Sequence, residues 1–234
     1  MVIGTNIIGF DSIDSTNDYL KRQTDVLEDG CICYALTQER GRGRRENNWI
    51  SPRGNLYFSI LKKNRLERNM IFSETIMISV AIAKIFEKYE LEPIIKYPND
   101  ILVNGKKIAG ILIETTGTEQ IDSVIIGVGI NINQEDFKSL NKKATSLKLQ
   151  RKGDYSLEDI LSELISIYNK LGDIDETYKI YLQKSLIINK EIILDNKKYR
   201  ISNIFLNGDI LIKNECEEVI INSNILDFSN LYND

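Results

Sequence analysis

The dipeptide Asn104-Gly105 constrains the fold of this 234-residue chain more than any other short feature. It lies between two apolar runs, residues 101–103 and 108–113. Asn-Gly between such runs is the strongest short-range signal for a β-hairpin, so two neighbouring antiparallel strands are expected here. A third strand is predicted at 123–130, where Gly127 and Gly129 alternate and leave one strand face bare. Glycines in a strand usually mark the close approach of a ligand or another backbone.

The rest of the chain predicts further strands and three longer helices. The expected strands are residues 7–11, 31–37, 55–61 and 94–97, and the expected helices are 73–89, 156–172 and 174–185. Ser73 and Ser156 are the expected N-caps, and Gly172 is expected to close the second helix. After about residue 187 the pattern changes to short runs at 191–194, 199–206, 209–213 and 218–221, which predicts a small β-barrel. The expected domains are therefore 1–186 and 187–234.

Composition excludes several classes of function. The chain contains no histidine, so Ser/His/Asp and Cys/His catalysis and histidine-ligated zinc are absent. A net charge of −4 argues against nucleic acid as a partner. Cys31 and Cys33 alternate within an apolar run, which favours reduced strand residues over a metal or redox pair. The chain shows neither a signal-peptide pattern nor an uninterrupted apolar run of about 18 residues, so we expect a cytoplasmic protein without a membrane partner.

The residues 41–45, Gly-Arg-Gly-Arg-Arg, form the most basic segment of this acidic chain. Glycine lets successive backbone N–H groups curl around an anion, and arginine binds carboxylate or phosphate through two parallel hydrogen bonds. The alternatives are a solvated charge run and a nucleic-acid-binding loop. Trp49, the sole tryptophan, follows four residues later, which suits a nucleotide whose adenine stacks on the indole. The alternative for Trp49 is an ordinary core residue.

A second group of candidates surrounds the hairpin. Lys106 and Lys107 should point to opposite faces of their strand, so that one can face a site and the other water. Ala109-Gly110 leaves room for a ligand beside that strand. Asp100 follows Asn99 in a Pro-Asn-Asp turn and is either a turn residue or a ligand for Mg²⁺, which favours one or two carboxylates together with phosphate oxygens.

Taken together, these blocks resemble biotin protein ligase, which attaches biotin to a lysine of a carboxyl carrier protein. The blocks follow the family order over nearly the whole chain: Asp14-Ser15-Thr16-Asn17, Gln38 with residues 41–45 and Trp49, Ser51-Pro52 with Gly54-Asn55-Leu56, residues 96–100, residues 105–114, and residues 127–131. The resemblance implies an α+β fold: a mixed sheet flanked by helices, like the core of class II aminoacyl-tRNA synthetases, followed by an SH3-like barrel.

The resemblance also implies roles for individual residues. The implied biotin-binding residues are Ser15, Thr16, Asn17, Gln38, Gly41, Arg42, Gly43, Arg44, Lys107, Gly110, Gly127 and Gly129, with the three later glycines leaving space for the thiophane ring. Residues 41–45 form a loop that orders over biotin and its adenylate. The implied nucleotide-binding residues are Arg42, Arg44, Arg45, Trp49, Asn99, Lys107 and Asn131. Lys107, Arg44 and Asp100 are the expected catalytic residues, and Asp100 is also the expected Mg²⁺ ligand.

The expected reaction uses ATP with Mg²⁺ to form biotinyl-5′-AMP and then biotinylates a lysine of the carrier. Tyr97 replaces a frequent tryptophan, and Glu46-Asn47-Asn48 makes the loop less basic than in relatives. The sequence starts about ten residues before the first block, so the monofunctional type without a winged helix is expected. Relatives often form homodimers, so a homodimer is a possible assembly for this chain. Lipoate protein ligase and a non-catalytic nucleic-acid-binding protein are the alternative functions.

Overall fold

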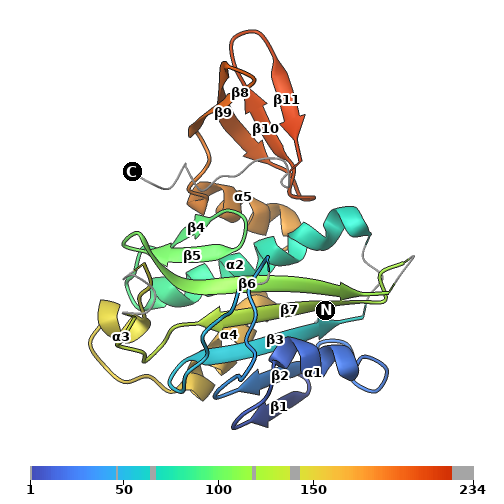
Figure 1. Cartoon of the computed structure of the whole chain (residues 1–234), viewed down its shortest axis with the longest axis vertical. Helices are drawn as coiled ribbons and strands as arrows, with labels where there is room; N and C mark the ends of the chain where they lie inside the picture. Colours follow the sequence, from blue (N-terminus) through green and yellow to red (C-terminus); the bar gives the residue numbers. More distant parts are fainter. Residues whose placement is uncertain (1, 46, 64–66, 118–119, 138–142, 223–234) are drawn as a thin grey trace.

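The computed structural model describes residues 2–45, 47–63, 67–117, 120–137 and 143–222. They form a seven-stranded sheet packed with helices and a four-stranded sheet at one end of the molecule (Figure 1). The strands of the large sheet are β1 (Ile7–Phe10), β2 (Ile32–Ala35), β3 (Leu56–Lys62), β4 (Ile94–Lys96), β5 (Asp100–Val103), β6 (Lys106–Thr116) and β7 (Ser123–Ile130). The predicted α+β fold with a mixed sheet is confirmed.

The large sheet has the order β1-β2-β3-β7-β6-β5-β4. Strands β1 and β2 are parallel, and every other neighbouring pair is antiparallel. The predicted hairpin joins β5 to β6 through Asn104 and Gly105, whose φ angles are 50° and 71°. Both residues thus adopt the left-handed conformation that a type I′ turn requires, which explains the Asn-Gly pair.

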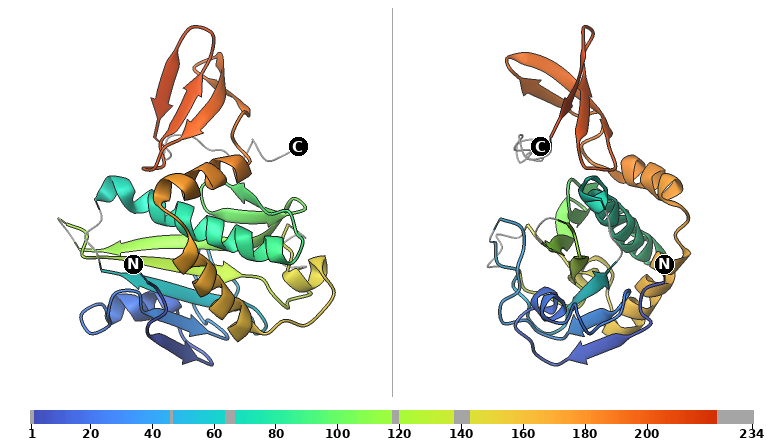
Figure 2. Two further views of the ribbon diagram at one scale, coloured as in Figure 1. Left: turned by 180° about the vertical axis from the view of Figure 1, so that it is seen from behind. Right: turned by 90° about the vertical axis from the view of Figure 1, so that its right-hand side faces the viewer.

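Helices cover both faces of this sheet (Figure 2). They are α1 (Thr16–Arg22), α2 (Ile71–Lys88), α3 (Leu147–Gln150), α4 (Leu157–Lys170) and α5 (Ile174–Lys184), with a 3-10 turn η1 (Arg68–Met70) before α2. Helix α1 contacts β2, β3 and β7, whereas α2 packs on α4 and α5 on the opposite side. Side chains alternate along β7, so Ile126 and Val128 belong to the large core under α2. Ile125 belongs to a small core under α1.

Helix α2 is the longest apolar element. The stretch Arg68–Lys88 is long and apolar enough to cross a membrane by length and composition alone, although no uninterrupted apolar run of that length was found in the sequence. Two thirds of its most apolar window, 67%, is nevertheless buried inside the protein. Burial by the sheet and by α4 and α5 accounts for this composition, as in the core helix of a globular protein.

Two of the predicted helix caps are treated differently by the structure. Ser156 is the N-cap of α4, and its hydroxyl accepts a hydrogen bond from the Asp159 amide at 3.1 Å. The prediction that Ser73 caps α2 is wrong. The helix begins at Ile71, and the Ser73 hydroxyl donates to the carbonyl of Met70 at 2.5 Å. The 3-10 turn η1 leads directly into the helix, so Ser73 already lies in the first turn of α2 and cannot be its N-cap.

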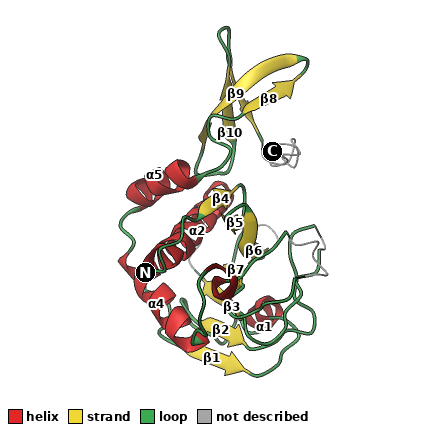
Figure 3. Cartoon of the chain, turned by 90° about the vertical axis from the view of Figure 1, so that its left-hand side faces the viewer, coloured by secondary structure: helices red, strands yellow, loops and turns green. Residues whose placement is uncertain are grey.

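The small sheet consists of β8 (Glu191–Leu194), β9 (Lys197–Ile204), β10 (Ile210–Lys213) and β11 (Glu218–Ile221). Its order is β11-β10-β9-β8 with antiparallel neighbours throughout, so β8 and β11 form its edges among the described residues. Helix α5 leads into it (Figure 3). Four short strands were predicted here and are confirmed, whereas closure into a barrel stays a prediction because residues 223–234 lie outside the described part of the chain.

Buried thiols support the prediction of reduced cysteines. Cys31 and Cys33 are both free and buried in the small core beneath α1. Burial, with a smaller contribution from Cys31, raises the pKa of the Cys33 thiol to about 12. A thiol with this pKa stays protonated at neutral pH and is a poor nucleophile.

Tyr97 connects the two sheets. Its hydroxyl donates to the carbonyl oxygen of Gly208 in the β9–β10 turn at 2.7 Å, and this hydrogen bond is buried. The ring also packs against Phe72 of α2, with 5.7 Å between ring centroids.

We therefore expect Tyr97→Phe to lower the free energy of unfolding by about 1–2 kcal/mol, because the Gly208 carbonyl would lose a buried hydrogen bond. Urea denaturation measures this change. Tyr19→Phe is the matched control, since the Tyr19 ring packs edge-on against Phe10. Equal stability of the Tyr97 variant and wild type would mean that this bond does not help to hold the sheets together.

Candidate functional site

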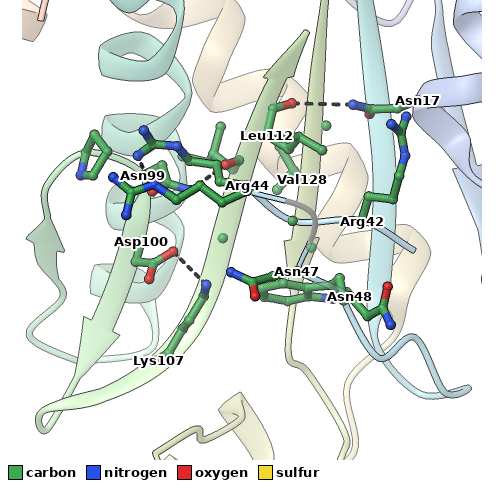
Figure 4. A pocket seen from close by; sticks show the side chains of 18 of the residues that line it. Asn17, Arg42, Arg44, Asn47, Asn48, Asn99, Asp100, Lys107, Leu112 and Val128 are labelled. Carbon is green, nitrogen blue, oxygen red and sulfur yellow. Dashed lines mark hydrogen bonds and ion pairs between the residues drawn. The ribbon is translucent and has the colours of Figure 1, made fainter. Parts of the chain in front are cut away.

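One cavity of about 320 Å³ lies on the α1 face of the large sheet. Its floor comes from β6 and β7, one wall from the start of α1, and another from the loop between β2 and β3 (Figure 4). Most of the predicted site residues line it: Ser15, Thr16, Asn17, Gln38, Arg42, Gly43, Arg44, Arg45, Trp49, Asn99, Asp100, Lys107, Gly110, Gly127 and Gly129. The structure thus brings together segments separated by more than one hundred residues.

The floor is built from glycines in register. Gly129 of β7 pairs with Gly110 of β6, and Gly127 pairs with Leu112. A Cβ atom on Gly129 would lie 2.6 Å from the Trp49 indole, and one on Gly110 would lie 2.7 Å from it. A Cβ atom on Gly127 would collide with the Asn17 amide. The alternating glycines are therefore explained by the close approach of the Trp49 and Asn17 side chains.

The uncharged polar end of the cavity is built at the start of α1. Ser15 is the N-cap, and its hydroxyl accepts from the Asp18 amide. This cap places Thr16 and Asn17 in the first turn of the helix, where both are buried. The backbone N–H of Thr16 donates to Gln38 Oε1 at 2.9 Å, which ties the segment after β2 to the start of the helix. Three amide or hydroxyl side chains consequently converge without a charge among them.

The segments of the basic loop on the two sides of residue 46 lie next to each other and share backbone hydrogen bonds. The Trp49 amide donates to the carbonyl of Gly41 at 2.9 Å, and the Gly43 amide donates to that of Asn47 at 2.7 Å. Gly41 itself does not line the cavity. A Cβ atom there would lie 2.5 Å from the Trp49 carbonyl, so this glycine permits the two loop strands to approach.

Two loop arginines contact different parts of the site. Arg42 pairs with Asp18 and with Glu114, the latter at 3.0 Å. Arg44 Nη1 donates to Asn99 Oδ1 at 3.3 Å, and Asn99 donates to the Ile111 carbonyl at 2.7 Å. Burial, followed by the nearby charge of Arg45, lowers the pKa of the Arg44 guanidinium. A desolvated arginine of this kind gains from an incoming anion.

Glu114 was not predicted as a site residue, although it follows Gly110 and Leu112 on the same face of β6. Its carboxylate accepts from Lys21 Nζ at 2.5 Å and from Asn17 Nδ2 at 2.7 Å. Burial alone would raise the pKa of this carboxyl, but the hydrogen bonds from Lys21 and Asn17 and the charge of Arg42 outweigh burial and lower it. The alternation of β6 was the signal that could have found it.

Lys107 and Asp100 form the charged end of the cavity. Lys107 Nζ lies 2.6 Å from Asp100 Oδ1 and 4.8 Å from the centre of the Trp49 ring. Lys106 is exposed, so the prediction that the two lysines face opposite ways is confirmed. Among the described residues no group of three or more histidines, cysteines and carboxylates could hold a metal ion.

Asn131 lies outside the cavity. Its side-chain Nδ2 donates to the carbonyl of Thr145 at 3.0 Å, and its backbone N–H donates to the carbonyl of Ile108 at 2.8 Å. These bonds fasten the segment after β7 to β6 and to residues near 145. Asn47, Asn48, Tyr97 and Val128 line the cavity without having been assigned a site role from the sequence.

The cavity has an uncharged polar end and a cationic end and lies on one face of a mixed sheet, an arrangement typical of proteins with sites for small anionic ligands. The chain belongs to the biotin/lipoate A/B protein ligase family, whose model matches residues 9–131, more than half of its length.

Curated relatives support this family. Over 123 residues the chain is 37% identical to the bifunctional ligase/repressor BirA of Escherichia coli, covering 51% of this chain and 38% of that protein. Over 207 residues it is 28% identical to the chloroplastic biotin–protein ligase 1 of Arabidopsis thaliana, covering 83% and 56%. The chain therefore spans about half the length of the curated relatives it matches.

Solved structures cover nearly the whole chain. The biotin protein ligase of Aquifex aeolicus in complex with biotin and ATP is 26% identical, with a TM-score of 0.77 over 93% of this chain and 96% of that one. The biotin protein ligase of Leishmania major with biotinyl-5-AMP shares the fold at 19% identity and a TM-score of 0.62, over 94% and 100% of the two chains.

The packing of Trp49 on the glycine floor can be tested directly, because Trp49 is the sole tryptophan. We expect Gly129→Ala to displace the indole, since the added methyl group would occupy its place. Tryptophan emission should shift to longer wavelength and acrylamide quenching should increase. Gly172→Ala is the control, because its Cβ would meet only the end of the Glu176 side chain. Unchanged emission and quenching in Gly129→Ala would refute this packing.

Proposed function

We propose that this chain activates biotin with ATP and transfers it to a lysine of a biotin carboxyl carrier protein or domain. The observation that carries the proposal is the division of one cavity into two ends. Ser15, Thr16, Asn17 and Gln38 suit the uncharged ureido ring, and the end with Arg44 and Lys107 suits the meeting point of a carboxylate and a phosphate. The bound ligands of the Aquifex aeolicus structure support the same assignment.

The first chemical step brings two anions together. A carboxylate oxygen of biotin attacks the α-phosphorus of ATP, and the bond from that phosphorus to the bridging oxygen breaks, releasing pyrophosphate. Lys107 and Arg44 neutralise the charge that builds up, and Arg45 extends this cationic side of the cavity. Arg42, which pairs with Asp18 and Glu114 beside Asn17, is the further arginine proposed to bind the nucleotide. The proposed adenine platform is Trp49, with Asn99 beside the nucleotide. In this proposal Asn131 does not touch the nucleotide but positions the backbone near Ile108 and Thr145.

The second step forms the amide. The carrier lysine attacks the acyl carbon of biotinyl-5′-AMP, the bond from that carbon to the AMP oxygen breaks, and the amine loses a proton. Asp100 is the proposed group that takes this proton. In the free protein it pairs with Lys107, so an incoming anion that attracts Lys107 releases the carboxylate. No enzyme nucleophile is needed, in keeping with a chain that contains no histidine.

A single carboxylate also fits Mg²⁺, which takes one or two carboxylates and otherwise phosphate oxygens and water. Asp100 would hold it, and the ion would supply charge neutralisation at the phosphates. The two proposed domains are a catalytic unit of residues 1–186, related to the class II aminoacyl-tRNA synthetase core, and an SH3-like unit of residues 187–234. A cytoplasmic location and a homodimer belong to the same proposal.

Lipoate is the second candidate substrate, because the matched family includes both biotin and lipoate ligases. Isothermal titration calorimetry with each compound separates them. The polar set around Thr16 favours biotin, since the dithiolane ring of lipoate offers no hydrogen-bond donors. Tighter binding of lipoate than of biotin would reverse the assignment.

Lys107→Ala should reduce biotin-dependent pyrophosphate release by about 10²–10³-fold, because it removes a charge donor at the site of developing negative charge. Lys106→Ala is the matched control, since this neighbouring side chain is exposed on the other side of the strand. Its rate should stay within about twofold of wild type. Near wild-type pyrophosphate release by Lys107→Ala would remove this lysine from the mechanism.

Arg44→Gly should weaken retention of the adenylate more than it weakens the encounter with biotin. Arg44 links the loop to Asn99, and a glycine-rich loop is costly to order without such contacts. The reactive anhydride should then escape and modify lysines of a bystander such as albumin, which mass spectrometry detects. Arg53→Gly, an exposed arginine paired with Asp11, is the control. Bystander labelling per adenylate at the wild-type level would show that Arg44 does not retain the intermediate.

A further inference from the structure

Three oxygen–oxygen contacts, two of them short, link four side chains in a row at the uncharged end of the cavity. Ser59 Oγ is 2.6 Å from Asn17 Oδ1 and 2.7 Å from Thr16 Oγ1. Thr16 Oγ1 is in turn 3.2 Å from Gln38 Oε1. Ser59 is fully buried, and Thr16 and Asn17 are exposed by only 3% and 4%. Bulk water therefore has little access to the protons in this row of contacts.

The two side chains at the ends of this row of contacts, Asn17 and Gln38, each present an acceptor oxygen to it, and their other hydrogen bonds fix that orientation. Asn17 Nδ2 donates to Glu114 Oε2 at 2.7 Å and to the Leu112 carbonyl at 3.5 Å (Figure 4), which leaves Asn17 Oδ1 facing Ser59. Since an ionised carboxylate only accepts, Glu114 excludes the flipped amide. The Lys21 and Arg42 charges keep Glu114 ionised.

At the other end, Gln38 Oε1 accepts from the Thr16 amide at 2.9 Å. Gln38 Nε2 donates to Ser51 Oγ at 3.1 Å.

This row of contacts has too few protons. Three oxygen–oxygen contacts lie between two acceptor ends, but the two hydroxyl groups of Ser59 and Thr16 supply only two protons. The contacts of 2.6 and 2.7 Å have hydrogen-bond lengths typical of hydroxyls, and the contact of 3.2 Å is longer, so we assign the two protons to the shorter contacts. In this assignment Ser59 donates to Asn17 and Thr16 donates to Ser59. The contact between Thr16 and Gln38 then holds no proton, and these two oxygens present lone pairs to each other.

We propose that Glu114 and Ser59 are positioning residues that hold Thr16 Oγ1 and Gln38 Oε1 as a pair of acceptors for one N–H group of the ligand. The inference rests on the proposed function, because the ureido ring of biotin carries two such N–H groups. Neither Glu114 nor Ser59 needs to touch the ligand. Glu114 fixes the orientation of the Asn17 amide, so that Asn17 Oδ1 accepts the proton of Ser59. Ser59 then accepts the proton of Thr16, and Thr16 Oγ1 can only accept a hydrogen bond from the ligand.

A different role for Glu114 is also visible, since it holds Arg42 of the basic loop. If holding the loop were its sole effect, a change at Glu114 would weaken all ligands that need the closed loop equally. The role in proton placement instead predicts discrimination between ligands that differ in a single N–H group. Ser59 separates the two roles further, because it contacts Thr16 and Asn17 and not the loop arginine.

The test measures binding by isothermal titration calorimetry in the full-length protein. The ligands are biotin and its two cyclic carbamate analogues, in which one or the other ureido N–H is replaced by oxygen. Glu114→Gln keeps the shape of the side chain but can donate to Asn17 and allow it to flip. Ser59→Ala frees the Thr16 proton to bond Gln38. Each variant should weaken biotin about tenfold, as expected for one unsatisfied hydrogen bond.

Two further results are expected if both residues act through one row of contacts. The double variant should weaken biotin no more than the stronger single variant, because the two changes remove the same acceptor pair. One carbamate analogue, lacking the N–H group that the pair accepts, should bind wild type and both variants with affinities within about twofold. Glu163 of α4 pairs with Lys88 of α2, and Glu163→Gln makes the same exchange there as a control. This variant should leave biotin binding unchanged.

The inference is overturned if both single variants bind biotin within twofold of wild type, if their losses add in the double variant, or if both analogues lose as much affinity as biotin. If Glu114→Gln does not fold, Ser59→Ala and the two analogues still decide the question. Failure of wild type itself to bind biotin would overturn the proposed function and this inference together. Wild-type binding with insensitive variants would overturn the inference alone.

Discussion

The glycine positions at the centre of the large sheet are the constraint on which the rest of the site depends. Gly110, Gly127 and Gly129 remove side chains from one face of β6 and β7 while the opposite face remains packed by Ile111, Ile126 and Val128. A strand with glycines is weakened locally. Here the neighbouring strands and the core under α2 hold the backbone in place, so the strands keep a flat floor on which the Trp49 indole packs. Helix α1 and the basic loop then supply the walls.

Much of this architecture was predictable because local signals agreed with one another. The Asn104-Gly105 turn, the alternation of β7 and the Ser156 cap each have a short-range physical cause, and each was found in place. Most of the predicted site residues line one cavity because their blocks lie at the start of α1, in the loop after β2 and on one face of β6 and β7, whereas Gly41 and Asn131 lie outside it. The short helix α3 escaped notice because four residues give no measurable periodicity.

Other features depended on contacts that no local pattern reveals. Glu114 was not assigned a role from the sequence, and the approach of Lys21, Asn17 and Arg42 makes it part of the site. Ser59 was not singled out either, and its contacts with Thr16 and Asn17 come from the packing of α1 on β3. Tertiary contacts thus assign roles to Glu114 and Ser59 that local preference does not reveal. The start of α2 was misplaced because Ser73 is a favourable cap in isolation, whereas the 3-10 turn η1 leads into the helix and moves its start to Ile71.

The indole of Trp49 has a consequence for the heat capacity of ligand binding. Burial of apolar surface makes the heat capacity of binding negative, and the amount scales with the area newly removed from water. The indole covers the glycine floor in this structure, and its N–H group is buried without a hydrogen-bond partner among the described residues. A ligand that binds on this floor replaces the apolar surface of the indole with its own. Its binding should therefore show a smaller heat-capacity change than the area of the ligand alone would suggest.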